Sequence, residues 1–126
     1  MYFSTTFVHL LFNNKETNRT VIFYKKYFES FFEKQTEKVK AKIVWTFSLI
    51  EQIEKVPETY LKHLENTVGL YEIRVQMSGD IYRIFCFFDK GDLVVLANGF
   101  QKKSQKTPKQ EIEKALKIKE EYEQEK

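Results

Sequence analysis

Residues 69–106 read GLYEIRVQMSGDIYRIFCFFDKGDLVVLANGFQKKSQK, and this stretch decides the fold. Its apolar and polar residues alternate on both sides of a Ser-Gly pair at residues 78–79, which is typical of two strands joined by a tight hairpin. A two-residue turn there places Arg74 directly opposite Arg83. The stretch therefore predicts an antiparallel hairpin with two arginines paired across it.

A second turn is predicted at residues 89–92, which read DKGD. It leads into a third strand and places Phe88 opposite Leu93. Continued along the strands, this pairing places Arg83 opposite Asn98. We expect a three-stranded meander that ends in a basic run.

The paired arginines indicate an anion site. Like charges directly across a ladder are destabilising, and an anion bound between Arg74 and Arg83 would relieve the repulsion. The planar guanidinium group is well shaped to bind phosphate. The alternative is structural, because Glu72 lies diagonal to Arg83 on the same face and could neutralise one charge in a solvated surface cluster.

The two faces of the meander differ in composition. One face is apolar and is expected to lie on helices; it comprises Tyr71, Ile73, Val75, Met77, Tyr82, Ile84, Cys86 and Phe88. The other face is mixed and carries the arginines. We expect an apolar strip beside them, made of Phe85, Phe87, Val94 and Leu96, that the last helix, the N-terminal segment or a protein partner covers.

Before the meander, residues 20–24 predict a strand, and aromatic residues at helical spacing predict a short helix through about residue 34. Thr36 is placed to cap a second helix that runs to about residue 56. The core stripe of that helix is expected to comprise Val39, Ile43, Phe47, Ile50 and Ile53. Trp45 lies off this stripe, where it can pack on a neighbour or a partner.

A final helix is predicted after the basic run. Residues 107–110, which read TPKQ, have a capping-box pattern with Pro108 at the first helical position. The buried side of the helix is expected to comprise Ile112, Ala115, Leu116 and Tyr122. At the other end of the chain, residues 1–12 are compatible with a strand.

Length and composition predict one domain over residues 20–126, preceded by an N-terminal extension, residues 1–19. Hydrophobic residues make up 42% of the 126-residue chain, which excludes a disordered class. The net charge is only +3, so the basic character is local and gathers in Lys102, Lys103, Lys106 and Lys109.

Several other classes of site are excluded. The chain has one cysteine, Cys86, which is expected to be a buried core residue, and this suits a reducing cytoplasm. With two histidines and no CxxC or HExxH motif, we expect no metal. No glycine-rich phosphate motif is present, so no cofactor is expected either. No apolar run reaches transmembrane length.

Three motifs carry a resemblance to a known family: GLYEIR at residues 69–74, IYRIFCFFDKGDLVVLANGF at 81–100 and KKSQKTPKQEIEKAL at 102–116. With them the chain resembles the phage-derived, HigB-like branch of the RelE/ParE toxin superfamily over roughly residues 20–120. The resemblance implies an α+β, RelE-like fold with one strand, two helices, a three-stranded antiparallel meander and a C-terminal helix.

The resemblance also implies a function. Members of this superfamily branch are toxins of type II toxin–antitoxin systems, and the chain is expected to be a ribosome-dependent, metal-independent endoribonuclease acting on translated mRNA. The implied partners are a helix-turn-helix antitoxin, the ribosome and mRNA, with no membrane. The implied reaction is attack by the RNA 2′-hydroxyl on the adjacent phosphate.

Site residues follow from the same resemblance. Carried over by position, Arg83 contacts the scissile phosphate, Arg74 is its basic neighbour, and Lys102 and Lys103 complete the catalytic set. The expected substrate-binding residues are Lys62, Asn98, Phe100 and Lys106. We expect Arg83→Ala to abolish growth arrest without unfolding the protein.

The proton donor and acceptor are open. Relatives often have a histidine where this chain has Asn98, and an asparagine cannot titrate. Lys102, Lys103 or His63 would then move the proton. Two other functions also stay open: a ParE-like toxin that poisons DNA gyrase, and a RelE-like module that has lost catalysis and only binds its antitoxin.

Overall fold

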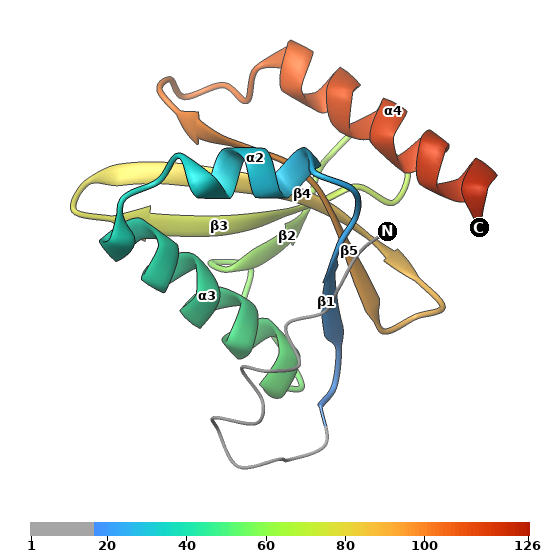
Figure 1. Ribbon diagram of the computed structural model, residues 1–126, viewed down its shortest axis with the longest axis horizontal. Helices are drawn as coiled ribbons and strands as arrows, with labels where there is room; N and C mark the ends of the chain where they lie inside the picture. The colour runs from blue at the N-terminus through green and yellow to red at the C-terminus, as the bar shows by residue number, and fades with distance from the viewer. Residues whose placement is uncertain (1–16) are drawn as a thin grey trace.

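The computed structural model describes residues 17–126 (Figure 1). In chain order the elements are β1 (Thr20–Phe23), α2 (Tyr27–Glu33), α3 (Glu37–Gln52), β2 (Leu61–His63), β3 (Tyr71–Met77), β4 (Asp80–Asp89), β5 (Leu93–Lys102) and α4 (Lys109–Glu125). The strand considered for residues 1–12 lies outside the described residues. Within the described part of the chain, no helix is both long enough and apolar enough to span a membrane.

The strands form one mixed sheet in the order β1-β5-β4-β3-β2. β1 runs parallel to β5, and the other neighbours are antiparallel. The predicted α+β class is confirmed, but the predicted count of four strands is wrong. The extra strand is β2, which has only three residues and pairs with β3 at Tyr71–Ile73, too short a run for alternation to reveal.

The hairpin between β3 and β4 has the predicted register, with Arg74 opposite Arg83. Its turn residues, Ser78 and Gly79, both have positive φ angles, 51° and 86°. Two left-handed residues give the backbone twist that matches a tight hairpin. The sequence prediction for this pairing is confirmed.

The register between β4 and β5 differs from the prediction. Asp89, not Phe88, pairs with Leu93, so the turn is one residue tighter on the β4 side. The ladder is then interrupted between Ile84 and Cys86, where β5 has two residues against one in β4. This bulge shifts the pairing again and places Arg83 opposite Phe100 rather than Asn98.

Helices cover both faces of the sheet: α2 and α3 lie on one face, and α4 crosses the other (Figure 1). The predicted helix-facing residues of β3 and β4 do pack with α2 and α3. Phe85 and Phe87 lie on the opposite face, and α4 covers them, as one of the predicted alternatives had it. Val94 and Leu96 were wrongly assigned to that strip: the changed register turns them toward α2 and α3, and Val95 and Ala97 take their place under α4.

The predicted cap of α3 is confirmed, because the Thr36 side chain accepts a hydrogen bond from the Val39 amide at 3.3 Å. The helix ends at Gln52, four residues before the predicted end. Ile53 has an extended backbone and is 38% exposed, so it does not belong to the core stripe. The four earlier stripe residues are buried.

The start of α4 differs from the predicted capping box. Pro108 has an extended backbone and occupies the cap position, and no side chain caps the first turn. The buried side of α4 also differs from the prediction: Leu116 is 38% exposed, and Ile118 is buried instead. The helix continues through its charged end to Glu125.

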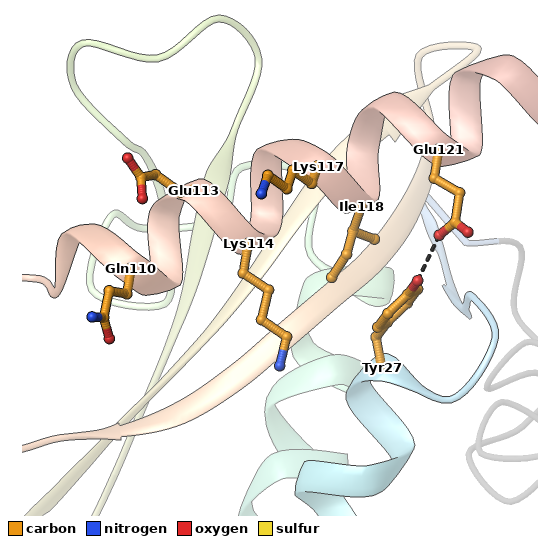
Figure 2. Close-up of a pocket in the computed structure, with 7 residues that line it drawn as sticks. All are labelled: Tyr27, Gln110, Glu113, Lys114, Lys117, Ile118 and Glu121. Atoms are coloured by element: carbon orange, nitrogen blue, oxygen red, sulfur yellow. Dashed lines mark hydrogen bonds between the residues drawn. The ribbon is translucent and has the colours of Figure 1, made fainter.

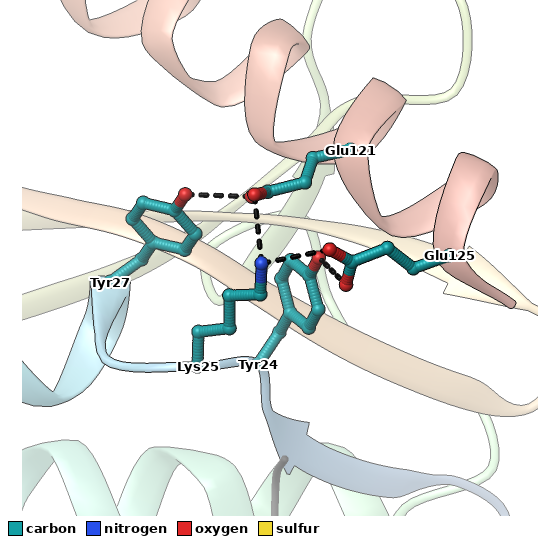
Figure 3. A network of polar contacts seen from close by, with 5 residues as sticks. All are labelled: Tyr24, Lys25, Tyr27, Glu121 and Glu125. Atoms are coloured by element: carbon teal, nitrogen blue, oxygen red, sulfur yellow. Dashed lines mark hydrogen bonds and ion pairs between the residues drawn. The ribbon is translucent and has the colours of Figure 1, made fainter.

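Polar contacts hold the C-terminal half of α4 against the segment between β1 and α2 and against the first residue of α2 (Figure 3). Lys25 pairs with both Glu121 and Glu125, at 2.8 and 2.9 Å. Tyr27 donates to Glu121 and Tyr24 donates to Glu125, each at 2.6 Å. Burial and the hydrogen bond to Glu125 raise the pKa of Tyr24 to about 12. These contacts fix α4 across the sheet, and its buried residues close the second core.

Candidate functional site

The site is centred on the arginine pair of the hairpin. Because Arg74 and Arg83 are directly paired on neighbouring strands, their side chains leave the sheet on the same face. Arg74 is partly exposed, and its Nη1 donates to the Glu58 carbonyl at 3.4 Å. Arg83 is only 6% exposed and donates to the Tyr82 carbonyl at 3.2 Å.

Glu72 supplies the counter-ion that the sequence suggested. Its Oε1 lies 3.0 Å from Arg83 Nε, an ion pair that is not aligned as a hydrogen bond. Both side chains are buried, so this is not the solvated surface cluster of the structural alternative. The burial also changes our expectation for Arg83→Ala, because that substitution would leave a buried carboxylate without its closest partner.

Two cavities open at the arginines. The first, about 570 Å³, is named here the cationic groove; it is lined by Arg74, Ile81, Arg83, Lys102, Lys103, Ser104 and Gln105. All four predicted catalytic residues therefore line one groove. The second cavity, about 360 Å³, shares Arg74, Ile81 and Arg83 with the first and continues past the edge of β3 to Lys42 of α3 and to Tyr60.

The groove perturbs the ionisation of its cations. Burial, followed by the charge of Arg74, lowers the pKa of Arg83, and Glu72 opposes this shift. Burial, followed by the charge of Arg83, lowers the pKa of Lys102. Lys102 lies on β5 and pairs with Ile81 of β4, two residues along the strand from Arg83. A lysine with a lowered pKa gives up its proton more readily at neutral pH than an ordinary surface lysine.

The predicted substrate-binding residues lie elsewhere, and neither cavity is lined by any of them. Lys62 lies on β2, where it is the backbone ladder partner of Glu72 on β3. Asn98 is buried and donates to the carbonyl and the carboxylate of Glu111 in the first turn of α4, so it ties that helix to the sheet. Phe100 packs on Phe85 in the core beneath α4, with ring centroids 5.3 Å apart.

The remaining candidates are also outside the two cavities. Lys106 is exposed on the segment before α4. His63 is exposed on β2, where its ring contacts Tyr71. Cys86 is buried on the face opposite the arginines, and burial raises the pKa of its thiol, so it is a core residue as predicted. In the described part of the chain no group of three or more potential ligands is arranged for a metal ion.

Sequence reasoning did not single out Lys42 and Tyr60, which line the second cavity. Lys42 looks like an ordinary solvent-facing lysine of α3, and Tyr60 lies in the segment between α3 and β2, which has no helix or strand pattern. The signal that could have found them is Trp45, a large aromatic residue off the core stripe whose ring contacts both.

A further cavity lies between α2 and α4 and is about 440 Å³ (Figure 2). Its charged lining residues are Glu113, Lys114, Lys117 and Glu121. Two acids balance two lysines, and Glu121 also accepts a hydrogen bond from Tyr27 (Figure 2). This balance gives the cavity no preference for a polyanion, in contrast to the cationic groove.

The fold and the groove define an α+β protein with a concave cluster of cations on one face of a mixed sheet. A family model described as phage-derived protein Gp49-like (DUF891) matches residues 30–120, and the chain belongs to this family. The family is one of RelE/ParE-like toxins. Among proteins with curated descriptions, none matches the chain.

Proposed function

We propose that this protein is the toxin of a type II toxin–antitoxin system and a ribosome-dependent mRNA endoribonuclease of RelE-like, HigB-like type. The observation that carries the proposal is the convergence of Arg74, Arg83, Lys102 and Lys103 on one groove. The proposed domain spans residues 20–126. Its proposed partners are a helix-turn-helix antitoxin, the ribosome and mRNA in the cytoplasm.

In the proposed reaction the 2′-hydroxyl of the substrate attacks the adjacent phosphate, which gives a cyclic phosphate and a free 5′-hydroxyl. Negative charge develops on the phosphoryl oxygens as the new bond forms. Arg74 and Arg83 lie opposite each other and can donate to these oxygens from two sides. Fixed donors of this kind stabilise the transition state more than the ground state.

Lys102 is the best-supported proton carrier in this scheme. It lines the groove beside the arginines, and its pKa is lowered by burial and by the charge of Arg83. A pKa closer to neutrality raises the fraction of neutral amine that can accept the 2′-hydroxyl proton. Lys103, which is exposed, would hold the flanking phosphates.

The test is primer extension on cellular mRNA after induction of the protein without its antitoxin. The proposal predicts new 5′ ends within translated regions, and none when translation initiation is blocked beforehand. Growth arrest with intact transcripts would contradict it and would favour a gyrase-poisoning toxin, which a DNA supercoiling assay would then identify.

A second candidate function is an antitoxin-binding module without catalysis. It is favoured by Asn98, which occupies the position where the resemblance implies a histidine. The Asn98 side chain donates hydrogen bonds to Glu111 and does not line the groove. Normal antitoxin binding together with no cleavage in a translating extract would support this candidate against the nuclease.

A further inference from the structure

An exposed aromatic pair stands beside the arginine site. Trp45 is 45% exposed on α3, although the stripe residues on either side of it, Ile43 and Phe47, are buried. Two positions along a helix turn a side chain about 200° away, which explains why Trp45 leaves the core. Its ring meets that of Tyr60 edge to face, with centroids 5.8 Å apart.

A cation completes this pair. Lys42 Nζ lies over the indole of Trp45, 4.3 Å from the ring centroid. The lysine is one helical turn before Trp45, so both side chains leave α3 on the same side. A single exposed tryptophan is ordinary on a protein surface. Here a neighbouring aromatic ring and a cation hold the indole in one orientation, so the ring is preorganised to bind a ligand.

The aromatic pair continues the arginine site. Tyr60 and Lys42 line the same cavity of about 360 Å³ as Arg74 and Arg83. The Tyr60 carbonyl accepts the Arg74 backbone amide at 2.9 Å, which fixes the tyrosine beside that arginine. β2 pairs with β3 only as far as Ile73, so none of the strands within residues 17–126 covers the edge of β3 at Val75 and Gln76 (Figure 1). The cavity passes toward α3 at this edge.

Single-stranded RNA has the chemistry that matches this arrangement. It alternates phosphates with unpaired bases, and proteins bind it with basic grooves flanked by aromatic rings on which the bases stack. A protein partner would also use an exposed tryptophan, but the arginines and Lys42 favour a polyanion. The flexible Lys42 side chain can move from the indole to a phosphate when a base takes its place.

We propose that Trp45 and Tyr60, with Lys42, form a base-stacking subsite for the nucleotide next to the phosphate bound by Arg74 and Arg83. The identity of the strand as RNA rests on the proposed function. The stacking subsite itself rests on the contacts of Trp45 and on the cavity that joins Tyr60 to the arginines.

The sequence offers a direct probe, because Trp45 is its only tryptophan. The ligand is a single-stranded 2′-deoxy tetranucleotide of adenine, which cannot be cleaved because it has no 2′-hydroxyl. Titration is expected to quench the tryptophan emission in a saturable way, with an affinity that falls as salt rises. Emission that does not change up to millimolar ligand would overturn the proposal.

Variants separate stacking from charge. Tyr60→Ala and Trp45→Leu are expected to weaken binding of a labelled tetranucleotide by about 10-fold, since stacking on one aromatic ring is typically worth that much or more. Lys42→Met should weaken it and flatten the salt dependence, whereas Lys38→Met, at an exposed position of the same helix, should not. Circular dichroism checks that each variant is folded.

The outcomes distinguish this proposal from the nuclease proposal. Quenching and variant effects without cleavage in a translating extract would support the subsite and contradict the nuclease. Cleavage at the normal rate by Trp45→Leu, with normal tetranucleotide affinity, would overturn the subsite and leave the nuclease standing. The same normal affinity together with loss of antitoxin binding would assign Trp45 to a protein interface instead.

Discussion

Replacing Arg83 is the most informative perturbation, because it changes folding and chemistry at once. Arg83 and Glu72 are both buried and lie 3.0 Å apart. Removing one partner of a buried ion pair leaves the other charge unpaired, which typically costs about 3–5 kcal/mol. Glu72 also interacts with Lys102. We therefore expect Arg83→Met to lower the free energy of unfolding by about 3 kcal/mol, the low end of that range.

The double variant Glu72→Met/Arg83→Met separates the two effects. Replacing both members of a buried pair with well-packed apolar residues of similar size is often neutral in stability, so its free energy of unfolding should lie within about 1 kcal/mol of wild type. Its activity should still fall by about two to three orders of magnitude, the usual loss for one transition-state donor. The folded double variant thus reports the chemistry alone.

Stability is measured by urea unfolding, and activity by mRNA cleavage in a translating extract. Glu72→Met alone serves as the matched control: it keeps the arginine donor, but it leaves the buried guanidinium unpaired and should therefore lose stability as Arg83→Met does. Two results would refute this reasoning. Wild-type stability in Arg83→Met would mean that the ion pair does not contribute as its burial implies. Cleavage within tenfold of wild type by the folded double variant would remove Arg83 from the active site.

Three further predictions follow from single contacts. Lys102→Met should reduce the rate of cleavage by about 10²–10⁴-fold, the usual contribution of a general acid or base, whereas Lys103→Met should mainly weaken substrate binding. Equal losses of the single-turnover rate in both variants would contradict the role of Lys102. Gly99→Ala should destabilise the fold by about 1–3 kcal/mol through overpacking, because a Cβ there would lie 2.6 Å from the Phe31 ring, and unchanged urea unfolding would contradict this packing. The pKa of Asp89 is lowered by its hydrogen bond from Tyr122 and then by Lys126, so its contribution to stability is fully present above the ordinary aspartate pKa and is lost as pH falls through the lowered value. Asp89→Asn should therefore be less stable than wild type by about 1 kcal/mol at pH 6, with the difference vanishing in acid; a difference that persists at low pH would contradict the assignment.

The hairpin between β3 and β4 could be predicted because its determinants are local. The turn residues Ser78 and Gly79 fix the register, and once the register is fixed the pairing of Arg74 with Arg83 and the two faces of both strands follow. The helix stripe of α3 was predictable for the same reason, since Thr36 marks its start and 3.6-residue periodicity does the rest.

The errors arose where the outcome depends on distant parts of the chain. The bulge in β5 follows from no turn motif, yet it moves Phe100 opposite Arg83. β2 is held by pairing with β3 and not by its own pattern. The burial of Arg83 likewise depends on its tertiary environment, so the sequence could suggest its pairing with Glu72 but not its loss of solvent.

That burial bears on the choice between a surface that only binds and a site that reacts. Charges that serve only to attract a partner can remain hydrated on the surface, and hydrated charges have little effect on the stability of the fold. Here Arg83 is only 6% exposed and Lys102 is partly buried, and burial lowers the pKa of both, so the fold gives up stability to hold one cation away from water and a second partly so. Perturbed ionisable groups that share a cleft are typical of functional sites, and a desolvated lysine gains a use in proton transfer that a hydrated one lacks. The cost is therefore better explained by a reaction on a phosphate than by docking alone, and Lys102→Met is the substitution on which this argument depends.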